Sequence, residues 1–158
     1  MAVTSDEFRA ALSRFPSGVT VVTTKDGEGR LHGMTVSAFC SVSLEPPLIL
    51  VCIEKTASSH PAILESGLFV VNILAEAQRD LSEHFASQLE DKFQVVKHQS
   101  GIHGLPVLDE IAASLECRLH ASYEGGDHTI FVGLIEKITV NNVRPLAYLH
   151  GDYRSIPH

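Results

Sequence analysis

The chain has 158 residues, the length of one domain of ordinary size and enough to bury a substantial apolar core. Its hydrophobic share of 44% and charged share of 20% exclude a disordered chain, and its longest purely apolar run, residues 48–53, is too short to span a membrane. A net charge of −7, with 12 scattered Lys and Arg side chains, argues against a nucleic-acid partner.

The first 25 residues pass from a helical to an extended pattern. Thr4 and Glu7 have the spacing of a capping box, and apolar residues then recur at helical spacing over residues 8–15. The Pro-Ser-Gly that follows is typical of a helix end. Residues 19–24 are β-branched throughout, which predicts a strand, and the turn after them contains two glycines.

The next segment alternates hydroxyl and apolar side chains over residues 34–43, so we expect one two-faced strand there. Prolines break the pattern before a fully apolar strand at residues 48–53. A short helix is expected within residues 55–67, with Ser58 or Ser59 as its N-cap and Gly67 as its end.

The second half of the chain predicts a strand at 68–74, a helix at 77–87 and a loop at 88–108. Strands at 111–123 and 129–140 are joined by Glu-Gly-Gly-Asp, a hairpin signal, and a last strand lies near 146–150. Strands therefore follow one another instead of alternating with long helices. This order favours a mainly β fold with short helices, an antiparallel barrel of six or seven strands, in a single domain covering residues 1–158.

Two polar clusters have the chemistry of a ligand site. The free amides at the start of the 55–67 helix, with Thr56, Ser58 and Ser59 beside them and Lys55 as a cation, suit a phosphate group, although a helix cap without ligand has the same sequence. The hydroxyls on one face of the 34–43 strand indicate either the lining of a pocket or a solvent-facing surface; they belong to Thr35, Ser37 and Ser41.

Other reactive side chains give weaker indications. His128 opens a strand directly after a hairpin turn, where a side chain is able to point into a cleft, although isolated histidines are more often ordinary surface residues. The histidine spacings do not suggest a metal site, and no serine or cysteine has the setting of a catalytic nucleophile. The three cysteines form no CxxC pair and lie in apolar stretches, so we expect reduced thiols in a cytoplasmic protein.

The order of several motifs resembles the short-chain flavin reductase family, the reductase components of two-component flavin monooxygenases. The most specific are residues 33–39, Gly-Met-Thr-Val-Ser-Ala-Phe, and residues 126–133, Gly-Asp-His-Thr-Ile-Phe-Val-Gly. Residues 15–24, 69–74 and 81–86 agree with the same family, so the resemblance covers nearly the whole chain.

This resemblance implies a split β-barrel of the FMN-binding type, antiparallel and homodimeric. It also implies an NAD(P)H-dependent flavin reductase, which transfers hydride from NADH or NADPH to FMN or FAD and supplies reduced flavin to a separate oxygenase. Such chemistry belongs to the cofactors, which agrees with the lack of a nucleophile or metal motif in the chain.

The resemblance also suggests roles for individual residues. The strand that runs along the flavin ring corresponds to Thr35, Val36, Ser37, Ala38, Phe39 and Ser41. The segment that holds the flavin phosphate corresponds to Lys55, Thr56, Ser58, Ser59 and His60. Phe85 matches a position that closes over the flavin, His128 one near the nicotinamide, and Tyr153 one in a C-terminal stretch that shapes the nicotinamide site.

Two other functions remain open at this point. A non-catalytic flavin or haem carrier would share the phosphate site without a nicotinamide site, and a pyridoxamine phosphate oxidase would need a second basic cluster that the scattered cations do not provide. The sequence does not decide between FMN and FAD, or between NADH and NADPH.

Overall fold

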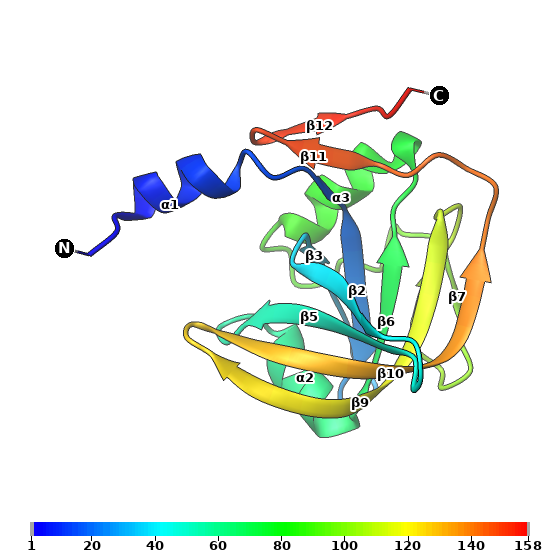
Figure 1. Cartoon of the computed structure of the whole chain (residues 1–158). Coiled ribbons are helices and arrows are strands. Elements are labelled where there is room, and N and C mark those ends of the chain that lie inside the picture. The colour runs from blue at the N-terminus through cyan, green and yellow to red at the C-terminus, as the bar shows by residue number, and fades with distance from the viewer. Residues whose placement is uncertain (1, 158) are drawn as a thin grey trace.

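The structure, a computed structural model, describes residues 2–157 and consists mainly of antiparallel strands (Figure 1). Its helical segments are α1 (Ser5–Leu12), α2 (Ser59–Ser66), the 3-10 turn η1 (Glu76–Gln78) and α3 (Arg79–Ala86). The strands are β1 (Ser17–Gly18), β2 (Thr20–Lys25), β3 (Leu31–Val36), β4 (Phe39–Ser43), β5 (Leu48–Glu54), β6 (Leu68–Ile73), β7 (His98–Ser100), β8 (Pro106–Leu108), β9 (Ala113–Gly125), β10 (His128–Val140), β11 (Ala147–Leu149) and β12 (Asp152–Arg154). The expected mainly β, antiparallel fold with short helices is confirmed.

Seven strands form the main sheet in the order β3-β2-β6-β9-β10-β5-β4, and every neighbouring pair is antiparallel. The edge strand β3 also approaches β5, so the sheet curls toward itself. Apolar side chains on its inner face form the core together with α2, as with Ile63 and Phe131, both fully buried. The long β9–β10 hairpin projects to one side of the body (Figure 1).

The prediction of a single strand over residues 34–43 is wrong. The chain leaves β3 at Val36, which pairs with Thr20, and enters β4 at Phe39, which pairs with Val51 at the other end of the sheet order. Between them the amide of Phe39 donates to the carbonyl of Ser37, two residues back, at 2.9 Å. This tight bend redirects the chain where period-2 alternation alone predicts a continuous strand.

Three other boundaries differ from the expectation. The helix predicted at 77–87 begins as η1 and becomes α-helical only at Arg79. The region 88–108 contains the small β7–β8 pair, and the last polar residues form β12 against β11. These strands of three residues are too short to show a hydrophobic period in the sequence.

Helix α1 has the predicted cap but no partner within residues 2–157. The amide of Glu7 donates to the Thr4 hydroxyl at 3.2 Å and the amide of Thr4 donates to the Glu7 carboxylate at 2.9 Å, so the capping box is complete. The helix stands away from the body, and none of its residues is buried (Figure 1). In the same range no helix is both long and apolar enough to cross a bilayer.

Candidate active site

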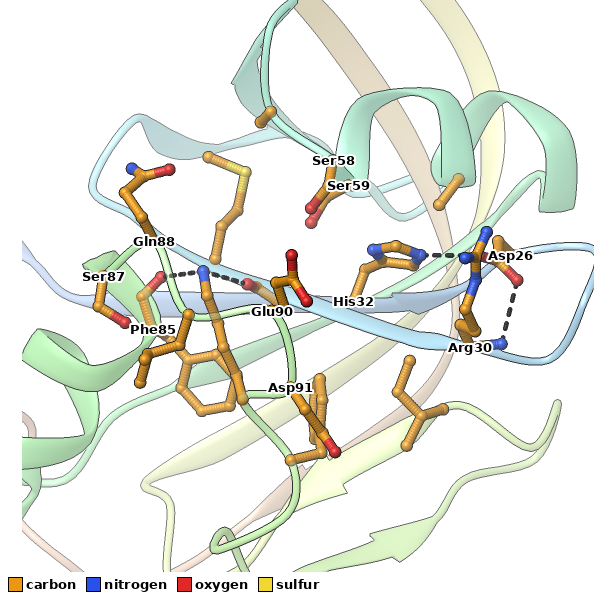
Figure 2. A pocket seen from close by; sticks show the side chains of 18 of the residues that line it. Asp26, Arg30, His32, Ser58, Ser59, Phe85, Ser87, Gln88, Glu90 and Asp91 are labelled. Atoms are coloured by element: carbon orange, nitrogen blue, oxygen red, sulfur yellow. Dashed lines mark hydrogen bonds and ion pairs between the residues drawn. The ribbon is translucent and has the colours of Figure 1, made fainter.

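A cavity of about 1350 Å³ lies between the β2–β3 turn, strand β3, the start of α2 and the segment that follows α3 (Figure 2). It exceeds the usual range for small-molecule sites, about 300–1,000 Å³, so it has room for a large ligand. The elements that enclose it come from three distant parts of the sequence.

The α2 end of the cavity contains an unpaired buried hydroxyl. Ser59 is 1% exposed, it lines the cavity, and its Oγ has no hydrogen-bond partner within residues 2–157. Its neighbour Ser58 is the N-cap of α2 but makes no side-chain capping bond. An unpaired buried hydroxyl destabilises the fold, and the first turn of a helix offers free amides and the positive end of the helix dipole. These groups together suit a phosphate.

The β2–β3 turn forms a second wall of the cavity. Asp26 accepts from the amides of Glu28 and Arg30, which fixes the turn, and Arg30 also donates to its carboxylate at 3.0 Å. The Nε2 of His32 lies 2.9 Å from the same carboxylate. The hydrogen bond from His32, aided by those from the turn, holds the pKa of Asp26 well below its usual value.

The segment after α3 forms the third wall. Lys92 donates its ammonium hydrogens to the carbonyls of Phe85 and Gly33, at 2.9 and 3.1 Å, and burial lowers the pKa of this lysine. The ring of Phe85 is fully buried and packs against Phe93. Because a Cβ on Gly33 would lie 2.7 Å from the Phe85 ring, only glycine allows β3 to approach α3 this closely.

Carboxylates outnumber cations around this cavity. The acidic side chains are Asp26, Glu54, Glu65, Glu90 and Asp91, whereas Arg30 and Lys92 are the basic ones among the described lining residues. Arg30 is paired with two carboxylates and Lys92 with two carbonyls. An anion is therefore left with neutral donors and His32 as its partners.

The tip of the β9–β10 hairpin lies beside the cavity wall. His128 pairs in register with Glu54, and the amide of Lys55 donates to the carbonyl of Asp127 at 3.0 Å. The Nδ1 of His128 lies 2.7 Å from the Asp127 carboxylate, and this contact lowers the pKa of Asp127. His128 therefore lies beside Glu54, which lines the cavity, and next to the segment that leads into α2, but it is not itself a lining residue.

The structure brings together some of the residues that the sequence suggested and separates others. The cavity is lined by Thr35, Thr56, Ser58, Ser59 and Phe85. Val36 is in the core, whereas Ser37, Ala38 and Ser41 are exposed at or near the bend, beside the half-buried Phe39. The buried ring of Phe85 is part of the cavity wall, and its suggested role in closing over the flavin stays a prediction.

Three further residues do not line the cavity. The ammonium group of Lys55 pairs with Glu124. His60 turns its ring away, to the hydroxyl of Thr129 at 2.7 Å and the ring of Phe131. Tyr153 packs on α3, where its hydroxyl is 2.9 Å from that of Ser82. Ser82 in turn accepts at its carbonyl from the Thr35 hydroxyl at 2.6 Å, so Tyr153 reaches the cavity wall only through α3.

Sequence reasoning missed Asp26, His32 and Lys92. The Asp and His are six residues apart across a turn with two glycines, a spacing that brings them face to face only if the turn closes as a hairpin. That hairpin was predictable, so the pair was within reach of the sequence. The position of Lys92 depends on a loop without periodicity, and no signal indicated it.

Comparison with known proteins agrees with this architecture. A model of the flavin reductase like domain matches residues 12–157. The reductase subunit of a stachydrine N-demethylase from Rhizobium meliloti is 41% identical over 92% of this chain, and the chain spans 63% of that protein and 47% of a probable flavin reductase from the same bacterium. An NADH-dependent flavin reductase from Rhodococcus is 40% identical, with 98% of this chain and 88% of the relative covered.

Solved structures give the same result. The NADH:FAD oxidoreductase of Streptomyces globisporus, in complex with NAD and FAD fragments, superimposes with a TM-score of 0.92 at 35% identity and covers 99% of this chain and 97% of its own. The match of the domain model to almost the entire chain, together with these relatives, shows that the chain belongs to the flavin reductase-like family.

Proposed function

We propose that this protein is an NAD(P)H:flavin oxidoreductase that transfers hydride from NADH to FMN or FAD and supplies reduced flavin to a separate monooxygenase. The observation that carries the proposal is the buried, unpaired Ser59 hydroxyl at the start of α2, in a cavity large enough for a flavin nucleotide. Relatives named as flavin reductases and as reductase components of monooxygenases support it.

In this proposal the flavin phosphate is held by Thr56, Ser58, Ser59 and the free amides of the first turn of α2. The hydrogen bonds from these amides and hydroxyls have to outweigh the repulsion between the phosphate and the five carboxylates that line the cavity. The flavin ring lies along the bend between β3 and β4, where Ser37 and Ala38 are exposed. Thr35 is oriented there by its bond to the carbonyl of Ser82.

His128 is assigned to the nicotinamide. Bound flavin and NADH supply the hydride chemistry themselves, so the chain has to hold the two rings in contact and exclude water between them. The Asp127 carboxylate orients the imidazole beside Glu54 of the cavity wall, and there we assign it to the nicotinamide amide. Tyr153 acts at greater distance, by fixing α3.

We also propose that the protein is a cytoplasmic homodimer whose sheet is a split barrel of the FMN-binding type. Helix α1 supports the dimer, because Phe8 and Leu12 are more than half exposed and a helix of eight residues is not stable without packing. A second copy of the chain is the partner we assign to this face. Sedimentation of the wild-type protein as a dimer, and of Leu12→Glu as a monomer, tests the assignment; a monomeric wild-type protein contradicts it.

The first experiment is NADH oxidation by the purified protein with FMN, with FAD and without flavin. We expect oxidation that depends on added flavin and saturates with it. Flavin binding without oxidation of either NADH or NADPH would instead indicate the non-catalytic carrier, and would remove the role assigned to His128. Failure to bind any flavin would contradict both functions.

A further inference from the structure

The carboxylates that line the large cavity differ in whether a cation neutralises them. Asp26 pairs with Arg30 at 3.0 Å, and Glu65 also attracts this guanidinium. The ammonium group of Lys92 donates to two backbone carbonyls. The other three carboxylates of the cavity wall are exposed and form no ion pair within residues 2–157; they belong to Glu54, Glu90 and Asp91. Negative charge is therefore in excess around the space that a ligand would occupy.

Glu90 is the unpaired carboxylate that extends furthest toward a ligand. It belongs to the segment after α3, which Lys92 ties to α3 and β3 through the two carbonyls that accept from its ammonium group. Figure 2 shows the Glu90 carboxylate pointing into the cavity, whereas the Asp91 carboxylate points to the other side of this segment. A ligand in the cavity therefore faces the charge of Glu90 more directly than that of Asp91.

Hydride transfer changes the charge of a flavin that is bound in this cavity. Hydride consists of one proton and two electrons, so the flavin ring that accepts it gains one negative charge, and the nicotinamide ring that gives it up becomes positive. The flavin phosphate keeps the same charge in both forms. Reduced flavin is thus one charge more negative than oxidised flavin, and negative side chains around it repel it more strongly.

We propose that the unpaired carboxylates of the cavity, Glu90 above all, weaken the binding of reduced flavin relative to oxidised flavin and so promote release of the product to the monooxygenase. The inference rests on the proposed function, because it takes the ligand of the cavity to be a flavin that leaves after reduction. The buried, unpaired Ser59 hydroxyl is assigned to the phosphate, which both forms share, so it favours neither. The carboxylates act on the ring, where the charge differs.

The test compares the dissociation constants of oxidised and reduced FMN, measured without oxygen, and the reduction potential of bound FMN with that of free FMN. Two unit charges about 8 Å apart in a partly solvated site change an affinity roughly threefold. With three unpaired carboxylates at different distances, we expect the wild-type protein to bind reduced FMN about tenfold more weakly, which lowers the potential of bound FMN by about 30 mV. The ratio should shrink at about 1 M salt, where charges are screened beyond about 3 Å.

Three variants assign the effect to individual carboxylates. Glu90→Gln should bring the ratio of the two dissociation constants about threefold closer to one, and Asp91→Asn should change it less, because its side chain points away. The matched control is Glu110→Gln, which removes the same charge from an exposed glutamate that does not line this cavity, and should leave the ratio unchanged. Binding of oxidised FMN by each variant shows that it is folded.

Three results would overturn the inference: reduced FMN that binds the wild-type protein as tightly as oxidised FMN, a ratio that Glu90→Gln changes no more than Glu110→Gln does, or a ratio that salt leaves unchanged. Any of these, in a protein that binds oxidised flavin and oxidises NADH, refutes the role of the carboxylates alone. A protein that binds no flavin refutes the proposed function as well.

Discussion

Two hairpins each carry a pair of Asp and His at or near the tip: the β2–β3 hairpin lines the cavity, and the tip of the β9–β10 hairpin lies beside Glu54 of the cavity wall. In the β2–β3 hairpin, Asp26 and His32 contact across the turn, and their side chains are 9% and 19% exposed. In the β9–β10 hairpin, Asp127 and His128 are adjacent in sequence, and their side chains are 87% and 41% exposed. The same two residue types therefore occur in a sequestered and in an open setting.

The two hairpins differ in how many hydrogen bonds hold their tips to the rest of the protein. The β2–β3 turn is tied to α2, since the amide of Gly27 donates to Glu65 at 3.1 Å, and Asp26 accepts four hydrogen bonds from its own hairpin. The tip of the other hairpin is tied to the body chiefly through Lys55. An exposed histidine at a hairpin tip suits a ligand that enters and leaves in each turnover, and we assign His128 to the nicotinamide.

The largest effect should come from a substitution in the β2–β3 hairpin, the more buried of the two. Gly33→Ala places a Cβ 2.7 Å from the ring of Phe85 and 3.0 Å from that of Phe93, so strand β3 has to move away from α3. We expect a loss of about 1–3 kcal/mol in the free energy of unfolding, measured in urea, together with weaker flavin binding. In the other hairpin, Gly125→Ala meets the carbonyl of His128 at 3.2 Å in an exposed turn, and should cost less. Equal losses would show that the two hairpins are equally constrained.

The next largest effect should come from a substitution in the exposed β9–β10 hairpin. His128→Ala removes the side chain assigned to the nicotinamide without touching the cavity walls, so the KM for NADH should rise about tenfold while the dissociation constant of FMN stays the same. Steady-state kinetics and a flavin titration on the same preparation separate the two. A parallel loss of both affinities would contradict the assignment of His128 to the nicotinamide.

Ser59→Ala tests the phosphate site that both hairpins flank. Since the hydroxyl has no partner in the free protein, its removal should leave the Tm unchanged or slightly higher, while FMN affinity falls about fivefold to tenfold. A fall in Tm with unchanged affinity would mean that the hydroxyl has a structural partner instead of a ligand. Thermal unfolding and flavin titration give both numbers.

Much of this fold was predictable because its long elements carry a clear period. Strands β5, β9 and β10 and the Gly67 end of α2 appear where β-branched runs and a left-handed glycine indicate them; Gly67 has a φ of 65°. The break after Val36 was not predictable from that period, because the hydroxyl alternation continues through residues 37 and 38 while the hydrogen-bond partner changes from β2 to β5. Which strands pair with each other depends on the tertiary fold, so a local sequence pattern does not predict it.

The residues of the site also differ in whether a local sequence signal or the tertiary fold determines their role. Ser58 and Ser59 were found because a helix start needs a cap, and that need is local. His32 and Lys92 were missed because their roles depend on what faces them, Asp26 across a turn and the carbonyls of Gly33 and Phe85 across the cavity. His60 shows the reverse case, since it lies in the phosphate segment of the sequence but its ring contacts Thr129 of β10.

The smallest effect, and the most direct measure of the contrast between the hairpins, is the pH dependence of stability. The pKa of Asp26 and that of Asp127 are both lowered, first of all by the hydrogen bond from the neighbouring histidine. A carboxyl group whose pKa is lower in the folded state stabilises the fold above its unfolded value, near pH 4, and this contribution is lost as the pH falls through and below that value. Asp26→Asn should therefore lower the Tm at pH 7, and the difference from the wild-type protein should shrink between pH 5 and pH 3. Asp127→Asn should have almost no effect at any pH, because water screens the exposed pair. Thermal unfolding of both variants at pH 7, 5 and 3.5 decides the matter, and similar curves for the two would mean that sequestration of the Asp26–His32 pair makes no energetic difference.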